Sequence, residues 1–353
     1  MSAEADGITR EELQLAARNH GMPLEVLRWP VTPVGMHYLL IHYDIPLVGD
    51  DWTMTVDGNV GTSFTLTLDE LRALPAHEVV ATMECAGNGR AKYTPRPISQ
   101  PWLDEAIGTG RWRGARLRDV LDRAAPGAGA VEALFTGLDR GIEGEEEQEF
   151  QRSLPLDLAY DDDVILAYDL NGAPLPPQHG SPLRLLVPGW YGMTNVKWLA
   201  RITLVDEPFG GYQQARGYHF RADDDDPGVP LQRIQPRALM VPPGIPEFMS
   251  RGRTVDAGRV TIEGRAWSGH APVEAVDFSA DGGRSWSPAQ LATDELGRWA
   301  WRGWSCVWDA TPGEHVLACR ARDAAGNEQP LEPTWNVGGD ANNAVQRVPV
   351  SVR

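Results

Sequence analysis

Cys85 is the residue whose surroundings most directly indicate chemistry in this sequence. It follows the apolar run at residues 79–83 and precedes a Gly-Asn turn, so its sulfur is expected to project from a strand end into a cleft. A cysteine there can be a nucleophile, a ligand of a soft metal centre, or a small core residue. The local sequence supplies no histidine base with an orienting carboxylate, and by itself it does not choose among the three.

The charged residues are strongly unbalanced between the two signs. Among 353 residues, 49 are acidic and 32 are basic, which gives a formal net charge of −17. A surface of that sign repels phosphate backbones and anionic lipid, so we expect no nucleic-acid partner and no membrane. Lys92 and Lys197 are the only lysines, and all other basic residues are arginines. Each lysine is therefore a position to examine for a particular task.

The elements predicted around Cys85 describe a mixed α+β first half. Helices are predicted over residues 9–18 and 116–124, and a further helix begins at Thr67, which forms a capping-box pattern with Glu70. Strands are predicted over residues 52–56, 79–83, 164–170, 183–187 and 196–205. The sequence lacks both βαβ regularity and a phosphate-binding glycine loop.

A change of composition between residues 222 and 246 predicts a linker. An acidic run is followed there by six prolines, which divides the chain into a domain at 1–235 and a second at 236–353. Beyond the linker, short alternating strands are predicted over residues 259–264, 273–279, 299–304 and 315–321. Regular short strands with turn signals, such as Asp-Gly-Gly at 281–283, predict an immunoglobulin-like β-sandwich.

Signals of location indicate a cytoplasmic protein. The sequence contains no stretch of 18 apolar residues that could span a membrane, and its polar N-terminus lacks an export signal. The odd and sparse count of three cysteines fits a reducing compartment, although pairing of Cys306 with Cys319 is undecided by sequence. The acid-rich segment at 143–149 lacks the spacing of a calcium loop and is predicted to be a solvated loop.

Eleven short blocks, in one order along most of the chain, carry a family resemblance. They are residues 18–23 (RNHGMP), 84–90 (ECAGNGR), 106–112 (AIGTGRW), 117–121 (LRDVL), 166–172 (LAYDLNG), 179–184 (HGSPLR), 187–190 (VPGW), 196–198 (VKW), 266–269 (AWSG), 281–283 (DGG) and 335–336 (WN). Together these blocks resemble the sulfite oxidase family of molybdenum enzymes. The number and the order of the blocks make the resemblance specific.

The resemblance implies a fold, a cofactor and an assembly. The family has an α+β molybdenum-cofactor domain followed by an immunoglobulin-like sandwich that often forms a dimer contact, which implies a homodimer. The implied cofactor is molybdenum–molybdopterin, a pyranopterin whose dithiolene holds the metal, with Cys85 as the protein's metal ligand. No CxxCH attachment site is present. A haem-free type is therefore expected, with electrons passing to an external acceptor such as a cytochrome or oxygen.

The resemblance also implies roles for individual residues. The positions that contact the pterin and its phosphate are Asn19, His20, Asp139, His179, Arg184 and Lys197. An arginine that forms bidentate hydrogen bonds and a lysine that supplies a compact positive charge both suit a buried anionic cofactor. The positions that surround the substrate anion are Arg18, Arg90, Trp102 and Tyr218. The remaining histidines show no metal spacing and receive no role: His37, His42, His77, His219, His270 and His315.

The implied reaction is oxidation of sulfite to sulfate by oxygen-atom transfer, in which arginines hold the anion. Two positions depart from the family pattern: Gly217 stands where an acid commonly precedes the pocket tyrosine, and Gly338 stands where an arginine is common. Because fewer cations hold a dianion less firmly, the alternative is the same cofactor acting on a sulfoxide or organic sulfur compound. A binding protein without turnover is the non-enzymatic alternative, and Tyr212 competes with Tyr218 for the pocket position.

Overall fold

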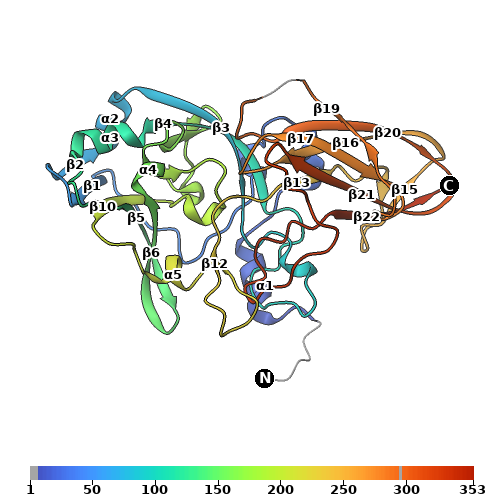
Figure 1. Cartoon of the computed structure of the whole chain (residues 1–353), viewed down its shortest axis with the longest axis horizontal. Coiled ribbons are helices and arrows are strands. Elements are labelled where there is room, and N and C mark those ends of the chain that lie inside the picture. Colours follow the sequence, from blue (N-terminus) through green and yellow to red (C-terminus); the bar gives the residue numbers. More distant parts are fainter. Residues whose placement is uncertain (1–6, 294–295) are drawn as a thin grey trace.

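The computed structural model describes residues 7–293 and 296–353, which form two halves lying side by side (Figure 1). The described residues form five β-sheets, and their longest α-helix has nine residues. Strands therefore dominate both halves. Among the described residues, no helix is long and apolar enough to cross a membrane.

Two five-stranded sheets build the first half. One has the order β2–β1–β10–β5–β6, from β1 (Thr53–Gly58), β2 (Phe64–Thr67), β5 (Glu132–Glu143), β6 (Glu146–Pro155) and β10 (Leu199–Val205). The other is built from β3 (Ala76–Glu84), β4 (Ile107–Arg116), β7 (Ile165–Leu170), β8 (Ala173–Pro174) and β9 (Arg184–Leu186). One buried apolar cluster contains residues of both sheets, such as Phe135 and Leu166. Burial of these apolar surfaces holds the two sheets together.

Local capping signals explain where two helices begin. The hydroxyls of Thr9 and Thr67 accept hydrogen bonds from the amides three residues on. The carboxylates of Glu12 and Glu70 in turn accept from the threonine amides. The helices are α1 (Arg10–Arg18), α2 (Leu68–Ala73), α3 (Leu117–Ala124), α4 (Leu156–Ala159) and α5 (Tyr212–Ala215). Short 3₁₀ turns lie at η1 (Leu24–Arg28), η2 (Val34–Met36), η3 (Arg90–Lys92), η4 (Pro177–His179) and η5 (Gly192–Thr194). The three helices predicted from sequence are confirmed.

The second half is a sandwich of two sheets. One sheet contains β13 (Arg237–Met240), β16 (Gly258–Trp267), β19 (Gln290–Leu291) and β20 (Arg302–Ala310). The other contains β14 (Ile245–Pro246), β15 (Arg253–Val255), β17 (Val273–Ser279), β18 (Ser287–Pro288), β21 (Gly313–Asp323) and β22 (Gln346–Val352). A second buried cluster joins side chains of both sheets, including Ile262 and Leu317. The expectation of a two-layer β architecture after residue 236 therefore agrees with the structure.

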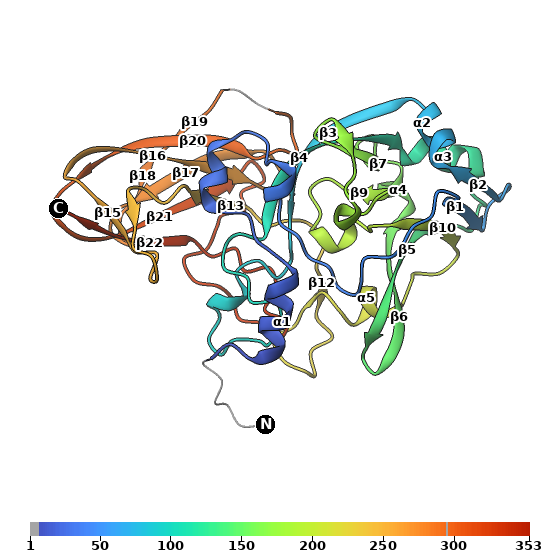
Figure 2. The ribbon, with the colours of Figure 1, turned by 180° about the vertical axis from the view of Figure 1, so that it is seen from behind.

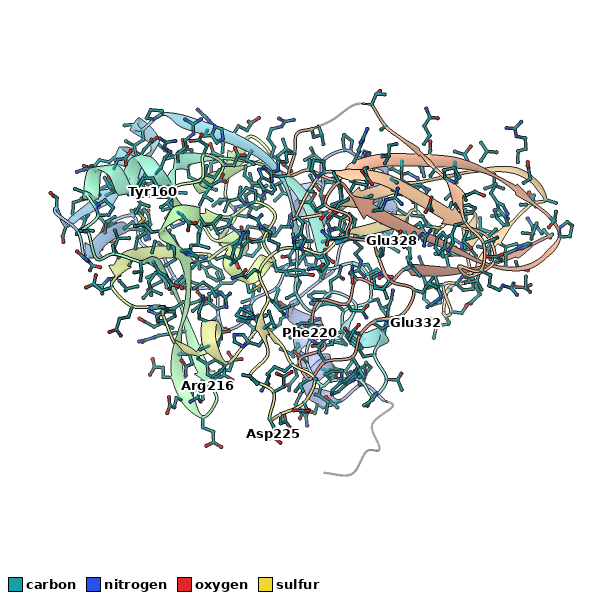
Figure 3. The ribbon with its side chains drawn as sticks, viewed as in Figure 1. Tyr160, Arg216, Phe220, Asp225, Glu328 and Glu332 are labelled. Atoms are coloured by element: carbon teal, nitrogen blue, oxygen red, sulfur yellow. The ribbon has the colours of Figure 1, made fainter. Side chains whose placement is uncertain are left out.

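The two halves are joined over a large contact. In the view from behind, the N-terminal segment runs across the sandwich (Figure 2), and the Arg265 guanidinium donates to the Leu27 carbonyl at 2.9 Å. The segment that carries Arg216, Phe220 and Asp225 runs beneath this junction (Figure 3), and includes the small hairpin of β11 (His219–Phe220) and β12 (Val229–Pro230). The first buried cluster continues into the sandwich through Trp267 and Trp301. Neither half is therefore packed independently of the other.

Three sequence expectations about these elements need correction. The linker is shorter than residues 222–246, because β13 lies within that range and pairs with β16. The acid-rich segment at 143–149 is the tip of the β5–β6 hairpin, since Glu143 pairs with Glu146 across its turn. The strand predicted at 299–304 begins only at Arg302. Cys306 and Cys319 are free thiols and form no disulfide.

Candidate functional site

Cys85 lies directly after β3, where a buried strand turns into a loop. The last six residues of β3 are buried, and the strand pairs with β4 along its whole length. The Cys85 amide donates to the Ala106 carbonyl, and the Cys85 carbonyl accepts from the Asn88 amide, each at 3.0 Å. A Cβ at Gly87 would come within 2.4–2.6 Å of the Arg90 guanidinium, so the loop requires glycine there. These contacts fix the position of the sulfur.

The Cys85 side chain lines a cavity of about 610 Å³, part of which is open to solvent. Its walls come from segments far apart in the sequence, and five of the predicted cofactor-binding residues line it: Cys85, Asp139, His179, Arg184 and Lys197. Burial raises the pKa of the Cys85 thiol to about 11, although Arg90 and Trp102 oppose that rise. The thiol is therefore protonated at neutral pH unless a bound cation stabilises the thiolate.

Arg184 is a buried cation in the wall of this cavity. Its guanidinium donates to the carbonyls of His179 and Asn195, each at 3.0 Å, and lies 4.9 Å from the centre of the Trp112 ring. Its Nε has no hydrogen-bond partner, and it forms no ion pair with a carboxylate of the described residues. Burial lowers the pKa of Arg184 to about 10, so it remains charged at neutral pH. A buried cation without a counter-ion is suited to an anionic ligand.

Lys197 and Asp139 are two further ionisable groups in the cavity wall, and they form no direct ion pair with each other. The Lys197 ammonium donates to the Leu40 carbonyl at 2.8 Å and lies 4.3 Å from the centre of the Trp198 ring. Asp139 is buried, and its Oδ1 has no hydrogen-bond partner. Burial lowers the pKa of Lys197 and raises the pKa of Asp139, while the attraction between them opposes both shifts. Asp139 therefore has an unpaired oxygen, and Lys197 is bonded only to backbone carbonyls, so a bound ligand could supply a further partner to each.

Three neutral histidines complete the polar wall of the cavity. His179 ends η4, and its ring meets that of His37 edge-on with the ring centres 5.6 Å apart. Burial and nearby cations lower the pKa of His179 to about 2 and that of His42 to about 3. Burial lowers the pKa of His37 to about 4. These rings are hydrogen-bonding groups without charge at neutral pH, so the positive charge of the wall comes from Arg184 and from the protonated form of Lys197, whose pKa burial lowers to about 7.

Tyr218 occupies the predicted tyrosine position, and Tyr212 does not. Tyr218 lines the cavity with Cys85, and its hydroxyl makes a 2.5 Å hydrogen bond with Nε2 of His42. Tyr212 begins α5 and packs instead beside Gly144, at the tip of the β5–β6 hairpin. Burial raises the pKa of Tyr218 far above its usual value. The Tyr218 hydroxyl is therefore neutral and can donate one hydrogen bond.

The predicted substrate residues Arg90, Trp102 and Arg18 do not share one environment. Arg90 is buried beneath the cysteine loop and pairs with Asp340 at 2.5 Å. Trp102 is buried, and its indole N–H faces the Cys85 thiol, whose pKa it lowers by hydrogen bonding. The Arg18 side chain is 41% exposed and pairs with Asp44 at 3.3 Å. None of the three is among the residues that line the cavity.

Asn19 and His20, the remaining predicted cofactor residues, follow α1. Asn19 is buried and positions two other segments: its Nδ2 donates to Gln100 at 3.1 Å, and its Oδ1 accepts from the Ile41 amide at 2.8 Å. His20 forms an antiparallel bridge with Leu39, but its side chain is exposed. Asn19 is therefore engaged in holding the chain, whereas His20 is exposed and is not among the residues that line the cavity.

A buried ionic network connects the cysteine loop to the sandwich. The Arg237 guanidinium, on β13, donates to Glu84 at 2.8 Å and to Asp104 at 2.7 Å. Glu84 immediately precedes Cys85, and its other oxygen accepts from the Trp267 indole at 2.8 Å. The Lys92 ammonium pairs with Asp104 at 2.5 Å, which assigns a structural contact to that lysine. The second half thus helps to set the position of the metal-ligand candidate.

Sequence reasoning missed several groups at the site. His37, His42 and Tyr38 line the cavity although no spacing distinguished them, because they come from the irregular segment between α1 and β1. Arg152 is buried with its guanidinium carbon 6.0 Å from the centre of the Tyr218 ring, and it forms no ion pair among the described residues. No helix or strand was predicted at residue 152, so the only available signal for Arg152 was its basic side chain. Such a signal is weak without the fold.

The residues present fit an anionic molybdenum cofactor. Cys85 offers one soft thiolate donor, and no group of three or more His, Cys, Asp or Glu side chains among the described residues could bind a metal ion. A soft metal at Cys85 would therefore take its other donors from a bound group such as a dithiolene. Arg184 and Lys197, two buried cations without ion-pair partners, suit the phosphate of such a group. Their arrangement defines the site of a molybdenum-cofactor oxidoreductase domain.

Comparison with known families agrees with that class. Residues 42–213 match the model of the oxidoreductase molybdopterin binding domain, and residues 235–353 match that of the Mo-co oxidoreductase dimerisation domain. The chain is 36% identical over 345 residues to mitochondrial sulfite oxidase of Homo sapiens, covering 91% of this chain and 62% of the human protein. It is 36% identical to sulfite oxidase of Gallus gallus, covering 90% of this chain and 72% of the chicken protein. The chain belongs to the sulfite oxidase family.

Two further similarities show how broad the relationship is. The chain is 31% identical to NADH nitrate reductase of Lotus japonicus, covering 91% of this chain but 39% of that enzyme. Sulfane dehydrogenase SoxCD of Paracoccus pantotrophus has the same fold, with a TM-score of 0.81 at 24% sequence identity over 99% of this chain and 89% of that chain. The chain spans about three fifths of the length of the mitochondrial sulfite oxidases that it matches.

Proposed function

We propose that this protein is a molybdenum-cofactor oxidoreductase that oxidises sulfite to sulfate and passes the electrons to an external acceptor. The observation that carries the proposal is that one buried thiol, Cys85, and two buried basic groups without a direct ion pair, Arg184 and Lys197, lie in the wall of one cavity. Sulfite oxidases of human and chicken are relatives over nine tenths of the chain. The bound molybdenum cofactor would supply the oxygen-atom transfer chemistry.

The residues of the cavity divide the remaining tasks. Cys85 would serve as the metal ligand, while Arg184 and Lys197 would hold the cofactor's phosphate, with Asn19, His20, Asp139 and His179 contributing contacts. Tyr218 would donate a hydrogen bond from its neutral hydroxyl to a substrate oxygen, while its hydroxyl oxygen accepts from Nε2–H of neutral His42. Arg18 and Arg90 would supply positive potential around the site. Trp102 would supply an apolar wall that excludes water near the thiol.

Substitution of the thiol tests the cofactor assignment. Cys85→Ser should leave the fold intact and abolish turnover, and it should lower the molybdenum content of purified protein because serine is a poor ligand for the soft thiolate position. Cys306→Ser is the matched control, since Cys306 lies on β20 in the sandwich, away from the cavity. Metal content by mass spectrometry and far-UV circular dichroism provide the readouts. Retention of full activity by Cys85→Ser would contradict the thiolate assignment.

A second candidate function keeps the cofactor and changes the substrate to a sulfoxide or another organic sulfur compound. Gly338 favours it, because the family resemblance places an arginine there and the glycine supplies no charge. Gly217 also departs from the family pattern, and there a Cβ would meet Gln213 Oε1 only at an ordinary 3.4 Å. Steady-state assays with an artificial acceptor or donor, across sulfite and uncharged sulfoxides, separate the two candidates. Fast sulfite turnover together with inactivity toward sulfoxides would end the second.

The assembly and the surroundings of the enzyme are also proposed. We infer a homodimer formed through an immunoglobulin-like sandwich, with domains at 1–235 and 236–353; the match to a dimerisation-domain model supports it. Light scattering on the purified protein tests the dimer, and a molar mass of one chain at micromolar concentration would contradict it. A cytoplasmic, haem-free enzyme that reduces a cytochrome or oxygen completes the proposal. Absorption spectra and acceptor assays on enzyme from its native host test these points.

A further inference from the structure

The guanidinium of Arg90 is already satisfied by acceptors within the chain. Its Nη2 pairs with Asp340 at 2.5 Å, its Nε donates to the Gly338 carbonyl at 2.9 Å, and its Nη1 donates to the Gln100 carbonyl at 3.3 Å. Both members of the ion pair are nearly inaccessible, with side-chain exposures of 9% and 6%. An anion approaching Arg90 therefore meets a cation whose charge is offset by a buried carboxylate.

The backbone around Asp340 holds its carboxylate in place. The Asp340 amide donates to Asn336 Oδ1 at 3.0 Å, and its carbonyl accepts from Asn336 Nδ2 at 2.8 Å and from the Tyr93 hydroxyl at 3.2 Å. The ion pair lies against the cysteine loop, because a Cβ at Gly87 would come within 2.4 Å of Arg90 Nη1. Burial is the main reason for the high pKa of Tyr218; the negative charge of Asp340 adds to the rise, and the charge of Arg90 opposes it. Asp340 and Arg90 thus act on the same region of the site with opposite signs.

The other two positions where the family resemblance implies a substrate cation add no buried positive charge. Arg18 is 41% exposed and lies in a surface pair with Asp44, and Gly338 contributes only a carbonyl, which accepts from Arg90. Arg152 adds a positive charge behind Tyr218, but the Asp340 carboxylate still offsets the charge of Arg90. A site built for a dianion would be expected to leave its arginines free for bidentate contacts.

We propose that Asp340 is a specificity-determining residue that offsets the charge of Arg90, so that the site prefers monoanionic or uncharged sulfur compounds to dianions. For sulfite, the species bound would be the hydrogensulfite monoanion. The inference rests on the proposed function, because it takes the region between Cys85 and Tyr218 to be where substrate binds.

Calorimetric titration of the molybdenum-loaded enzyme with two oxyanions of different charge tests the proposal. The probes are sulfate, a dianion, and methanesulfonate, a monoanion with the same three-oxygen face. Because Coulomb energy is proportional to ligand charge, Asp340→Asn should tighten sulfate binding by roughly tenfold and methanesulfonate binding by roughly threefold. Asp277→Asn is the matched control: Asp277 pairs with Arg320 at 3.1 Å in the sandwich, and its substitution should change neither affinity.

The outcomes separate the alternatives. An equal change for both anions in Asp340→Asn, or no change, would overturn the charge assignment, since a merely structural effect has no reason to scale with ligand charge. Asp340→Glu keeps the charge and should retain the wild-type preference. If Asp340→Asn does not fold, the wild type still decides, because tighter binding of sulfate than of methanesulfonate would overturn the proposal. Failure of the loaded enzyme to oxidise sulfite would refute the proposed substrate while leaving these affinities interpretable.

Discussion

Replacing Arg237 by methionine tests whether the sandwich holds the cysteine loop in place. Arg237 is 1% exposed, and its guanidinium donates to Glu84, to Asp104 and to the Asn342 carbonyl. Methionine would fill much of the volume of the side chain and remove the charge. The two carboxylates would then remain buried without their shared cation, next to the residue that we assign as the metal ligand.

The remaining partners of the two carboxylates set the expected magnitude. Removing one partner of a buried ion pair typically costs about 3–5 kcal/mol, because the other charge stays buried and unpaired. Glu84 would keep its hydrogen bonds from the Trp267 indole and the Asn88 amide group, at 2.8 and 2.9 Å. Asp104 would keep its ion pair with Lys92 at 2.5 Å. We therefore expect a loss of about 3 kcal/mol in the free energy of unfolding, at the lower end of that range.

Urea denaturation of the purified variants measures this loss. Arg353→Met is the matched control, because the pair of Arg353 with Asp256 is exposed, with side-chain exposures of 68% and 81%. Breaking an exposed pair should change the free energy of unfolding by less than about 1 kcal/mol. We also expect Arg237→Met to retain less molybdenum than the control. A loss below about 1 kcal/mol in Arg237→Met would refute the argument that this network positions the loop.

The two lysines and one buried histidine give three further predictions. Lys197→Met should lower the molybdenum content of purified protein by roughly tenfold, which metal analysis checks. It should not lower the stability of the cofactor-free protein in thermal unfolding, since it removes a buried charge that lacks an ion pair. Lys92→Met should instead destabilise the protein by about 2 kcal/mol in urea denaturation, because it weakens the pairing of buried Asp104. Burial lowers the pKa of His42 from 6.5 to about 3. Below pH 6.5 the unfolded chain therefore binds a proton that the folded chain excludes. The free energy of unfolding should fall, for this group, by about 1.4 kcal/mol for each unit by which the pH falls. His42→Gln should reduce that slope by the same amount between pH 6 and pH 4, and an unchanged slope in denaturation experiments would contradict the assignment.

The local patterns of the sequence predicted many elements correctly, because the signals for these elements lie within a few residues. The Thr67–Glu70 pair marked the start of α2 through a capping box that the structure contains. The apolar run before Cys85 predicted the buried part of β3. The predictions failed where long-range pairing decides. The acid-rich segment at 143–149 belongs to a hairpin because β5 pairs with β6 and also with β10, which composition does not encode.

The sequence by itself determined the family, because blocks in one order along most of the chain carry the resemblance, and it predicted a set of cofactor-binding residues. Five of those residues line one cavity. Only the tertiary structure decided which tyrosine faces the cavity, that His37 and His42 belong to it, and that Lys92 is a structural partner of Asp104. It also brought Asp340 to Arg90 across 250 residues of chain. Such pairings depend on how the two halves pack together, and no local pattern of residues records that packing.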